Sequence, residues 1–194
     1  MHTFVGLLAF AFAGSVSPGP NNTLLWASGM RFGFRPTAPH VIGTALGIGG
    51  LLVAAAAGVG ALLAEVPSAE VVLKVVGSVY LLVIAYLVLG GGEITRADVS
   101  RPLSLAQAAG FQFVNPKAWV FAIAVVGTFF PAEVHVIRDG LLTCVVALVV
   151  VVSSSIWAAG GTWLGRRIED ERTLRVVNLV LASLIVASVV LIWV

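Results

Sequence analysis

The chain alternates between long apolar runs and short polar connections. Charged residues and turn formers divide its 194 residues into six apolar segments, at 3–30, 37–64, 71–90, 106–130, 140–164 and 175–194. About 20 apolar helical residues cross the hydrocarbon core of a bilayer, so each segment is close to spanning length. The pattern predicts an all-α integral membrane protein with about six transmembrane helices and no soluble domain.

The six segments fall into two halves that share a landmark. We expect a single transmembrane domain over the whole chain, with a three-helix repeat at 1–90, a linker at 91–105 and a second repeat at 106–194. Three helices reverse the direction of the chain, so the halves form inverted repeats. Segments one and four, the first of each half, are interrupted at Ser17-Pro18-Gly19-Pro20-Asn21-Asn22 and at Asn115-Pro116-Lys117. Paired breaks of this kind point to a binding site.

Lysine and arginine are concentrated in the first, third and fifth connections, while both termini lack them. Cytoplasmic loops are enriched in these residues. We therefore expect the odd-numbered connections in the cytoplasm and both termini outside. Segment one could instead re-enter the membrane at its break, which would move the N-terminus inside.

Composition excludes several classes of protein. With 59% hydrophobic and 10% charged residues the chain is too apolar for a soluble domain. The net charge of +2 comes from scattered basic residues that form no patch, so no nucleic-acid partner is expected. Cys144 is the single cysteine, which leaves no disulfide and no metal-ligand spacing, and no cofactor is expected. The interrupted first run, with no Lys or Arg before it, argues against a signal peptide.

The first break predicts a polar cavity inside the membrane. Pro18 and Pro20 flank Gly19 and must unwind the helix, which frees backbone groups that hydrocarbon does not solvate. Ser17, Asn21 and Asn22 are placed to bond those groups. Pro20 can open a second half-helix whose amide-rich N-terminus favours a carboxylate. The alternative is a simple kink whose backbone groups are satisfied by neighbouring helices.

Lys117 is the most informative single residue, because it lies about 15 Å into segment four, near the bilayer midplane. A charge there costs at least about 2.5 kcal/mol on insertion scales. Every acidic residue lies at or near a predicted helix end, so no midplane carboxylate is available. Lys117 could bind the carboxylate of a substrate, or rest neutral and carry a proton, or donate to carbonyls freed by Pro116 and only hold the fold together.

Other residues extend this hypothesis. We predict that Asn115 and Pro116 bind substrate with Lys117, and that the lining of the cavity includes Ser17, Gln112, Trp119 and Gly47. For His40, near the start of segment two, a gate role is the alternative to the expected capping or solvation. Ser153-Ser154-Ser155 is assigned to helix packing. Small residues at helical spacing in segment two permit a homodimer without demonstrating one.

The Ser17–Asn22 stretch, with Gly33-Phe34-Arg35 and Gly43-Thr44-Ala45-Leu46-Gly47, resembles the lysine-exporter (LysE/RhtB) family of amino-acid efflux proteins. Phe111-Gln112-Phe113-Val114-Asn115-Pro116-Lys117 looks like the second signature of that family, and Trp157-Ala158-Ala159-Gly160 with Asn178 resembles its C-terminal helices. The resemblance covers essentially the whole chain.

The resemblance implies an exporter in the cytoplasmic membrane of a prokaryote. It would be driven by a proton or ion gradient, without ATP, and would move amino acids or their derivatives outward. The residues of the two motifs are most similar to those of the exporters of cysteine and O-acetylserine. Many relatives carry an acidic residue in the middle of the second helix, whereas this chain has Leu46-Gly47-Ile48-Gly49-Gly50-Leu51, which argues against a cationic substrate.

Two other functions are possible for a helical membrane bundle of this size. An intramembrane enzyme needs a nucleophile and base, or a metal set, at midplane depth, and the sequence offers none. A metal-ion or other small-ion exporter or channel of similar architecture remains as the alternative, although the missing midplane acids count against it.

Overall fold

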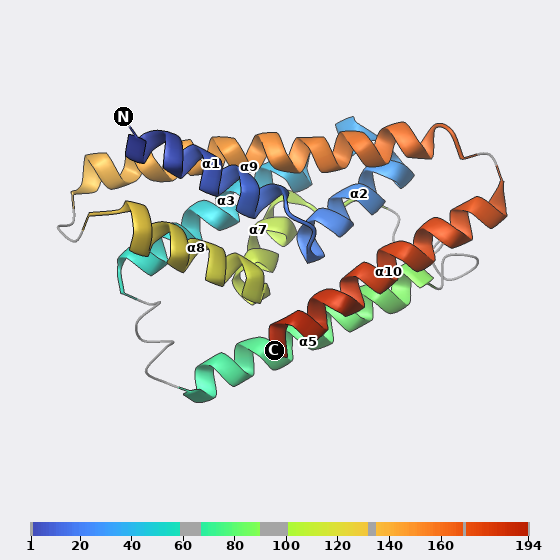
Figure 1. Cartoon of the computed structure of the whole chain (residues 1–194). Helices are drawn as coiled ribbons and strands as arrows, with labels where there is room; N and C mark the ends of the chain where they lie inside the picture. The colour runs from blue at the N-terminus through green and yellow to red at the C-terminus, as the bar shows by residue number, and fades with distance from the viewer. Residues whose placement is uncertain (1, 59–66, 90–100, 132–134, 169, 194) are drawn as a thin grey trace.

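The computed structural model describes residues 2–58, 67–89, 101–131, 135–168 and 170–193, and every regular element within them is a helix (Figure 1). The predicted all-α class is confirmed. The helices are α1 (His2–Val16), α2 (Pro20–Phe32), α3 (Phe34–Ala56), α5 (Pro67–Leu89), α7 (Leu105–Val114), α8 (Pro116–Phe129), α9 (Val136–Gly165) and α10 (Glu171–Trp193).

Both predicted helix breaks are present. Segment one is divided into α1 and α2 by Ser17, Pro18 and Gly19, and segment four is divided into α7 and α8 by Asn115. The two halves of segment four meet at an angle of 77°. Pro20 and Pro116 each occupy the first turn of the following helix, where proline is favoured because that position needs no amide donor. The breaks therefore follow directly from the local sequence.

The connection between segments one and two is shorter than predicted. The expected polar connection at 31–36 is mostly helical, and the single residue Gly33 separates α2 from α3. Gly33 has a φ of 86°, in the left-handed region that glycine adopts without a steric penalty. One glycine thus suffices to reverse the chain, and α2 and α3 pack side by side.

The helices pair across the two halves of the chain in a matched way. Both parts of the first broken segment, α1 and α2, pack on α9, and both parts of the second, α7 and α8, pack on α3. The two central helices α3 and α9 also pack on each other, and α5 pairs with α10 along the lower edge in Figure 1. Exchanging the halves leaves this set of pairings unchanged.

Glycines allow the broken helices to approach their partners closely. Where α2 crosses α9, a Cβ at Gly29 would collide with the carbonyl oxygen of Ala158, and one at Gly161 with that of Trp26. Where α3 crosses α7, a Cβ at Gly43 would collide with the carbonyl oxygen of Leu105. Contacts this close between backbones are typical of helix packing in membranes.

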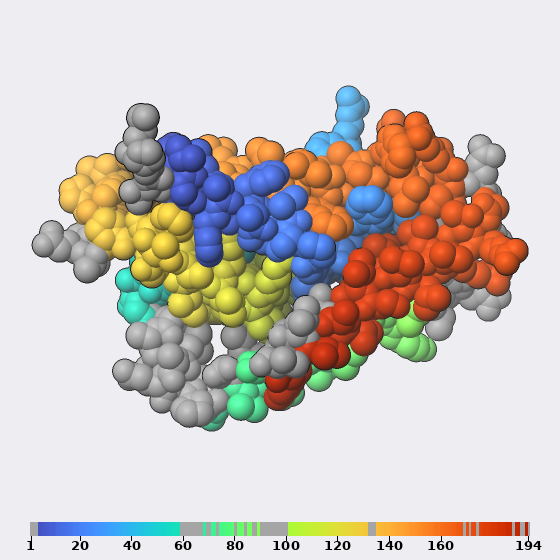
Figure 2. Space-filling model, in the orientation of Figure 1, coloured from blue at the N-terminus to red at the C-terminus, as the bar shows by residue number. Residues whose placement is uncertain are grey.

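The outer surface is apolar in a way that suits lipid. Large hydrophobic side chains such as Val72 on α5, Leu148 on α9 and Leu179 on α10 are more than half exposed. Figure 2 shows the surface from one side, where α1 and α9 lie above α8 and α10 crosses close to α2. An apolar exterior of this extent is characteristic of a membrane protein.

Length and apolarity alone qualify two of the described helices as membrane spans, α3 and α9, and the bent pair of α7 and α8 adds a third. The count of six spans therefore stays a prediction. Residues 91–100 of the predicted linker lie outside the described residues. Residues 101–104 lead into α7, which begins with a capping box in which Ser104 and Gln107 bond each other's backbone amides.

Candidate functional site

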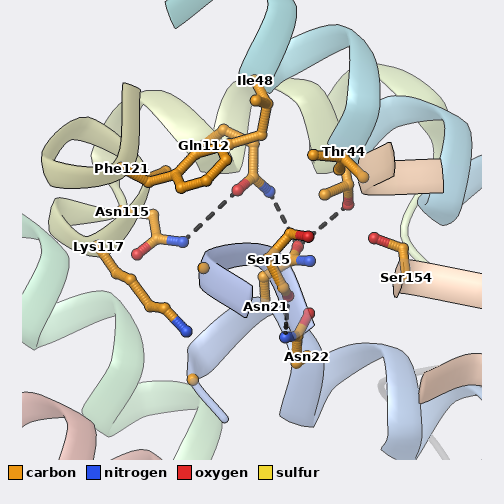
Figure 3. A pocket seen from close by; sticks show the side chains of 14 residues that line it. Ser15, Asn21, Asn22, Thr44, Ile48, Gln112, Asn115, Lys117, Phe121 and Ser154 are labelled. Carbon is orange, nitrogen blue, oxygen red and sulfur yellow. Dashed lines mark hydrogen bonds between the residues drawn. The ribbon is translucent and has the colours of Figure 1, made fainter. Parts of the chain in front are cut away.

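A cavity of about 50 Å³ lies where the two broken helices meet α3 and α9 (Figure 3). Because a buried water needs roughly 10–15 Å³ of such space, the cavity has room for a few water molecules. Side chains from all four elements face it, with Gln112 and Asn115 on one side, Thr44 and Ser154 on the other and Asn21 between them. The lining residues are Gly14, Ser15, Gly19, Asn21, Asn22, Thr44, Ile48, Gln112, Asn115, Lys117, Ala118, Phe121, Val150 and Ser154.

The carbonyl oxygens at the broken C-terminal end of α1 all have hydrogen-bond donors. Each backbone carbonyl from residue 13 to residue 19 accepts a hydrogen bond from a backbone or side-chain donor. Asn22 Nδ2 donates to the oxygens of Ser15 and Ser17 at 2.7 and 2.9 Å. Trp157 Nε1, on α9, donates to the oxygen of Val16 at 3.0 Å. Side chains from outside α1 thus satisfy the carbonyl oxygens freed at the break, and a membrane interior requires that such groups be satisfied.

Lys117 joins the two breaks. Its Nζ donates to the carbonyl oxygen of Ser17 at 2.8 Å, to Ser17 Oγ at 2.8 Å and to the carbonyl oxygen of Pro18 at 2.9 Å. An ammonium has three donors, so all three are engaged. The positive charge also lies at the C-terminal, negative end of the α1 dipole. The carbonyls that Lys117 satisfies belong to the first break, and not to the residues around Pro116.

A chain of amide hydrogen bonds links the same helices on the other side of the cavity. Asn21 Oδ1 accepts from Thr44 Oγ1 at 3.1 Å and from Gln112 Nε2 at 2.9 Å. Gln112 Oε1 in turn accepts a longer bond of 3.5 Å from Asn115 Nδ2. These side chains are all buried. The network connects α3, α2, α7 and the second break, so the position of each broken helix depends on the other.

Two features of the cavity are left open for a ligand. Asn115 Oδ1 is buried and has no hydrogen-bond partner. The first turns of α2 and α8 both line the cavity, and neither Gly19 nor Asn115 caps its helix with a side-chain bond. A Cβ at Gly19 would lie 2.8 Å from Lys117 Nζ, so the glycine lets the ammonium approach the start of α2. The cavity therefore offers an acceptor at one point and positive potential at another.

A protein-family model matches this chain over nearly the whole length of the chain. The model for the LysE type translocator aligns with residues 12–192. The chain belongs to the LysE type translocator family. It is accordingly a membrane transport protein and not an enzyme, and the resemblance noted in the sequence is confirmed.

Curated relatives of this LysE-type translocator carry a more specific description. The cysteine/O-acetylserine efflux protein of Salmonella typhimurium is 26% identical over 181 residues, which cover 92% of this chain and 91% of the relative. The protein of the same name from Escherichia coli K12 is 25% identical with the same coverage. No solved structure matches the chain.

The structure separates the predicted site residues of the translocator into two groups. Six of them line the cavity, namely Gly19, Asn21, Asn22, Gln112, Asn115 and Lys117. The others lie around it without lining it, namely Ser17, Pro18, Pro20, Gly47, Pro116 and Trp119. Trp119 points its Nε1 to the carbonyl oxygen of Phe113 and belongs to an apolar cluster. Gly47 packs against α7, where a Cβ would lie 2.6 Å from the oxygen of Ala109.

Sequence reasoning missed several lining residues. Thr44 and Ser154 present hydroxyl groups to the cavity from α3 and α9. Thr44 and the serine triplet that contains Ser154 are polar positions within apolar segments, and this feature of the sequence could have identified them. The expectation for His40 was wrong, because it is 1% exposed and neither ring nitrogen has a partner, so it neither caps a helix nor meets solvent.

Proposed function

We propose that this LysE-type translocator is a secondary-active exporter of amino acids or their derivatives in the cytoplasmic membrane of a prokaryote. Cysteine and O-acetylserine are the first substrates to test, because the relatives named above are described as efflux proteins for them. Such substrates are zwitterions, with an ammonium and a carboxylate held close together. A suitable site must therefore offer an acceptor and positive potential within one small cavity.

The observation that carries this proposal is the pair of open positions in the cavity. The unpartnered Asn115 Oδ1 would accept a hydrogen bond from the substrate ammonium. The first turn of α2, at Pro20, Asn21 and Asn22, together with the charge of Lys117, would bind the carboxylate. No fixed negative charge lines the cavity, which suits a zwitterion better than a cationic substrate.

Because the cavity is small, export requires a change of conformation. A volume of about 50 Å³ is room for a few waters, so an amino acid fills the cavity and must widen it wherever the two differ in shape. Substrate binding would therefore accompany separation of the helices around the cavity. In our proposal this separation opens the site to one side of the membrane at a time, as alternating access demands.

The architecture that we propose has six spans in two inverted repeats. The spans would be α1 with α2, α3, α5, α7 with α8, α9 and α10. The matched pairing of α1 and α2 with α9, and of α7 and α8 with α3, supports a two-fold relation between the halves. The distribution of Lys and Arg supports cytoplasmic odd-numbered connections and outside termini.

The driving force in this proposal is a proton or ion gradient. A small-ion exporter is not favoured, because the relatives are efflux proteins for amino-acid derivatives. In addition, none of the residues that line the cavity is a His, Cys, Asp or Glu, the usual side-chain ligands of metal ions.

Efflux from loaded cells tests the proposal. Cells that express the wild type, Lys117→Met or Lys74→Met would be loaded with cysteine or O-acetylserine and followed by mass spectrometry, with and without a protonophore. Lys74 is the other lysine of the chain and lies on α5, outside the cavity lining, so it controls for loss of a lysine. We expect wild type and Lys74→Met to export faster than Lys117→Met, and the protonophore to abolish the difference. Equal efflux from all three in correctly inserted protein would contradict the site assignment.

A further inference from the structure

A buried histidine stands next to the cavity and takes no part in the site described above. His40 is 1% exposed, and neither Nδ1 nor Nε2 has a hydrogen-bond partner. It lies six residues into α3, about 9 Å from the start of that helix. Thr44 and Ile48, one and two turns further along the same face, line the cavity. His40 therefore lies between the cavity and the Gly33 turn.

Two polar pairs flank the level of His40 along the contact of α2 with α3, with the apolar Leu25 of α2 buried between them. On the turn side, the hydroxyl groups of Ser28 and Thr37 are 2.8 Å apart. On the cavity side, Thr44 Oγ1 lies 3.1 Å from Asn21 Oδ1 and 3.0 Å from the carbonyl oxygen of His40, and its single proton is shared between these two acceptors. All four of these side chains are buried. Polar groups thus lie along the interface from the cavity to within one turn of Gly33, whose carbonyl oxygen accepts a bond from Thr37 at 2.8 Å.

An imidazole in this position is costly unless it acts in another conformation. A neutral imidazole has one donor and one acceptor, and burying both without partners costs free energy that an apolar side chain of the same size would avoid. The cost disappears when water reaches the ring. Histidine is also the side chain whose charge changes most readily near neutral pH. The position suits a group that exchanges a proton when the helices around it open.

The charged groups nearest to His40 in the described part of the chain are exposed arginines at helix ends. The stretch of α2 opposite it runs from Asn21 to Ser28 and has no titratable side chain, and α7 has none either. On α8 only Lys117 titrates, and it is bonded to Ser17 and Pro18. Arg31 lies in the last turn of α2, over the ring of Phe32, and Arg35 lies in the first turn of α3, and both are exposed.

Within α9 the titratable groups, Arg138, Asp139 and Cys144, lie at the level of the other end of α3. Arg166 and Arg167 follow α9 at the end nearer His40, about 12 Å or more along the helix axis from Ala158, and both are exposed. Val41, the residue after His40 on α3, clusters with Ala158 of α9, so His40 lies at the level of Ala158. Further along α3, Gly49 faces Thr143 of α9. About twenty residues of helix, or roughly 30 Å, separate Arg138 and Asp139 from Ala158. The fixed charges nearest to His40 are therefore exposed arginines that water screens, and access of water to the ring governs whether it takes up a proton.

We propose that His40 is the proton-binding site of the translocator and couples proton entry to substrate export. A proton from the outer solution adds to the free ring nitrogen when the cavity is open to the outer side, and it leaves to water at the Gly33 end of α3, on the inner side, after the helices rearrange. No other bond forms or breaks. The proposal rests on the proposed function, because it supplies the coupling step of that export.

The test uses the purified full-length protein in lipid vesicles, with the membrane potential clamped at zero by valinomycin and equal potassium. The probe is labelled cysteine under reducing conditions. With the vesicle interior one pH unit more acidic than the medium, one proton exchanged per substrate gives tenfold accumulation inside, since one pH unit corresponds to a factor of ten. We expect tenfold accumulation for the wild type and none for His40→Gln, whose side chain keeps a donor and an acceptor but does not titrate.

A second measurement separates coupling from binding. At equal pH, exchange of labelled for unlabelled cysteine needs the cavity but no net proton movement, so we expect His40→Gln and His40→Asn to remain within twofold of wild type. Tenfold accumulation by either variant would overturn the assignment, as would loss of exchange in a variant that stays monodisperse and thermally stable. Wild-type exchange without accumulation would overturn it from the wild type alone. If the wild type exchanges no amino acid, the proposed function falls and this inference with it.

Discussion

The carbonyl oxygen of Ser17 provides a direct test of how the two breaks are held together. It accepts from Asn22 Nδ2 at 2.9 Å and from Lys117 Nζ at 2.8 Å. In Asn22→Ala the Ser17 oxygen keeps Lys117, and in Lys117→Met it keeps Asn22. Only the double variant leaves this oxygen without a partner. Its destabilisation should therefore exceed the sum of the two single effects.

The expected magnitude follows from the cost of an unsatisfied group. An unpaired buried acceptor costs about 1–3 kcal/mol, and hydrogen bonds measured within membrane proteins average about 0.6 kcal/mol with a maximum near 1.7 kcal/mol. We therefore expect a coupling energy of about 1 kcal/mol between Asn22 and Lys117. Each single variant should also lose stability, since Ser15 loses its Asn22 donor in one and Pro18 its Lys117 donor in the other.

The assay is a double-mutant cycle on reversible unfolding in lipid bicelles, with transport recorded in parallel. The control cycle combines Lys117→Met with Trp157→Phe, because Trp157 donates to Val16 and shares no acceptor with Lys117. We expect additivity there, within about 0.3–0.5 kcal/mol. An Asn22–Lys117 coupling no larger than that of the control would refute the shared-acceptor argument.

Three further predictions concern packing, the ligand and the membrane. Gly29→Ala should destabilise by about 1–3 kcal/mol, because its Cβ would meet the oxygen of Ala158, whereas Gly110→Ala, in open space, should lose nothing in the same thermal melt. Asn115→Ala should raise the KM for export about tenfold and lower the melting temperature modestly, because Gln112 Oε1 loses its long bond, and an unchanged KM would remove Asn115 from the site. Cys144 is exposed about 12 Å into α9, so a membrane-impermeant maleimide should label it only after denaturation, and rapid labelling in intact membranes would contradict burial of α9 in lipid.

The helix breaks were predictable because their cause is local. Proline lacks an amide donor wherever it stands, so Pro20 and Pro116 mark the start of α2 and α8 whatever surrounds them. The depth of Lys117 and the lack of a nearby acid could also be read from spacing alone. The partner of Lys117 could not, because Ser17 lies 100 residues away along the chain and the contact depends on how α8 packs beside α1.

The residues that sequence reasoning misplaced share a different cause. Depth along a helix follows from residue number, but burial depends on the direction in which the side chain points across the bundle. His40 lies near the end of α3 and is nevertheless buried, because its face meets other helices. Trp119 lies at the depth of the cavity and turns away from it toward Phe113. The faces of an apolar helix that is covered on all sides carry no strong periodic signal.

The three bonds of Lys117 have a consequence for the transport cycle. Because every ammonium donor is already engaged, a substrate carboxylate would replace the Ser17 and Pro18 oxygens as acceptor, and would not add to them. The exchange would contribute little net affinity. It would, however, release the end of α1 from α8, which are the elements that close the cavity together with α2 and α7. A ligand shifts a conformational equilibrium only through interactions that differ between the two states. If Lys117 binds the carboxylate as proposed, occupancy of the site and loosening of the link between the two breaks are one event, and the residue that holds the empty cavity closed is also the one that senses the substrate.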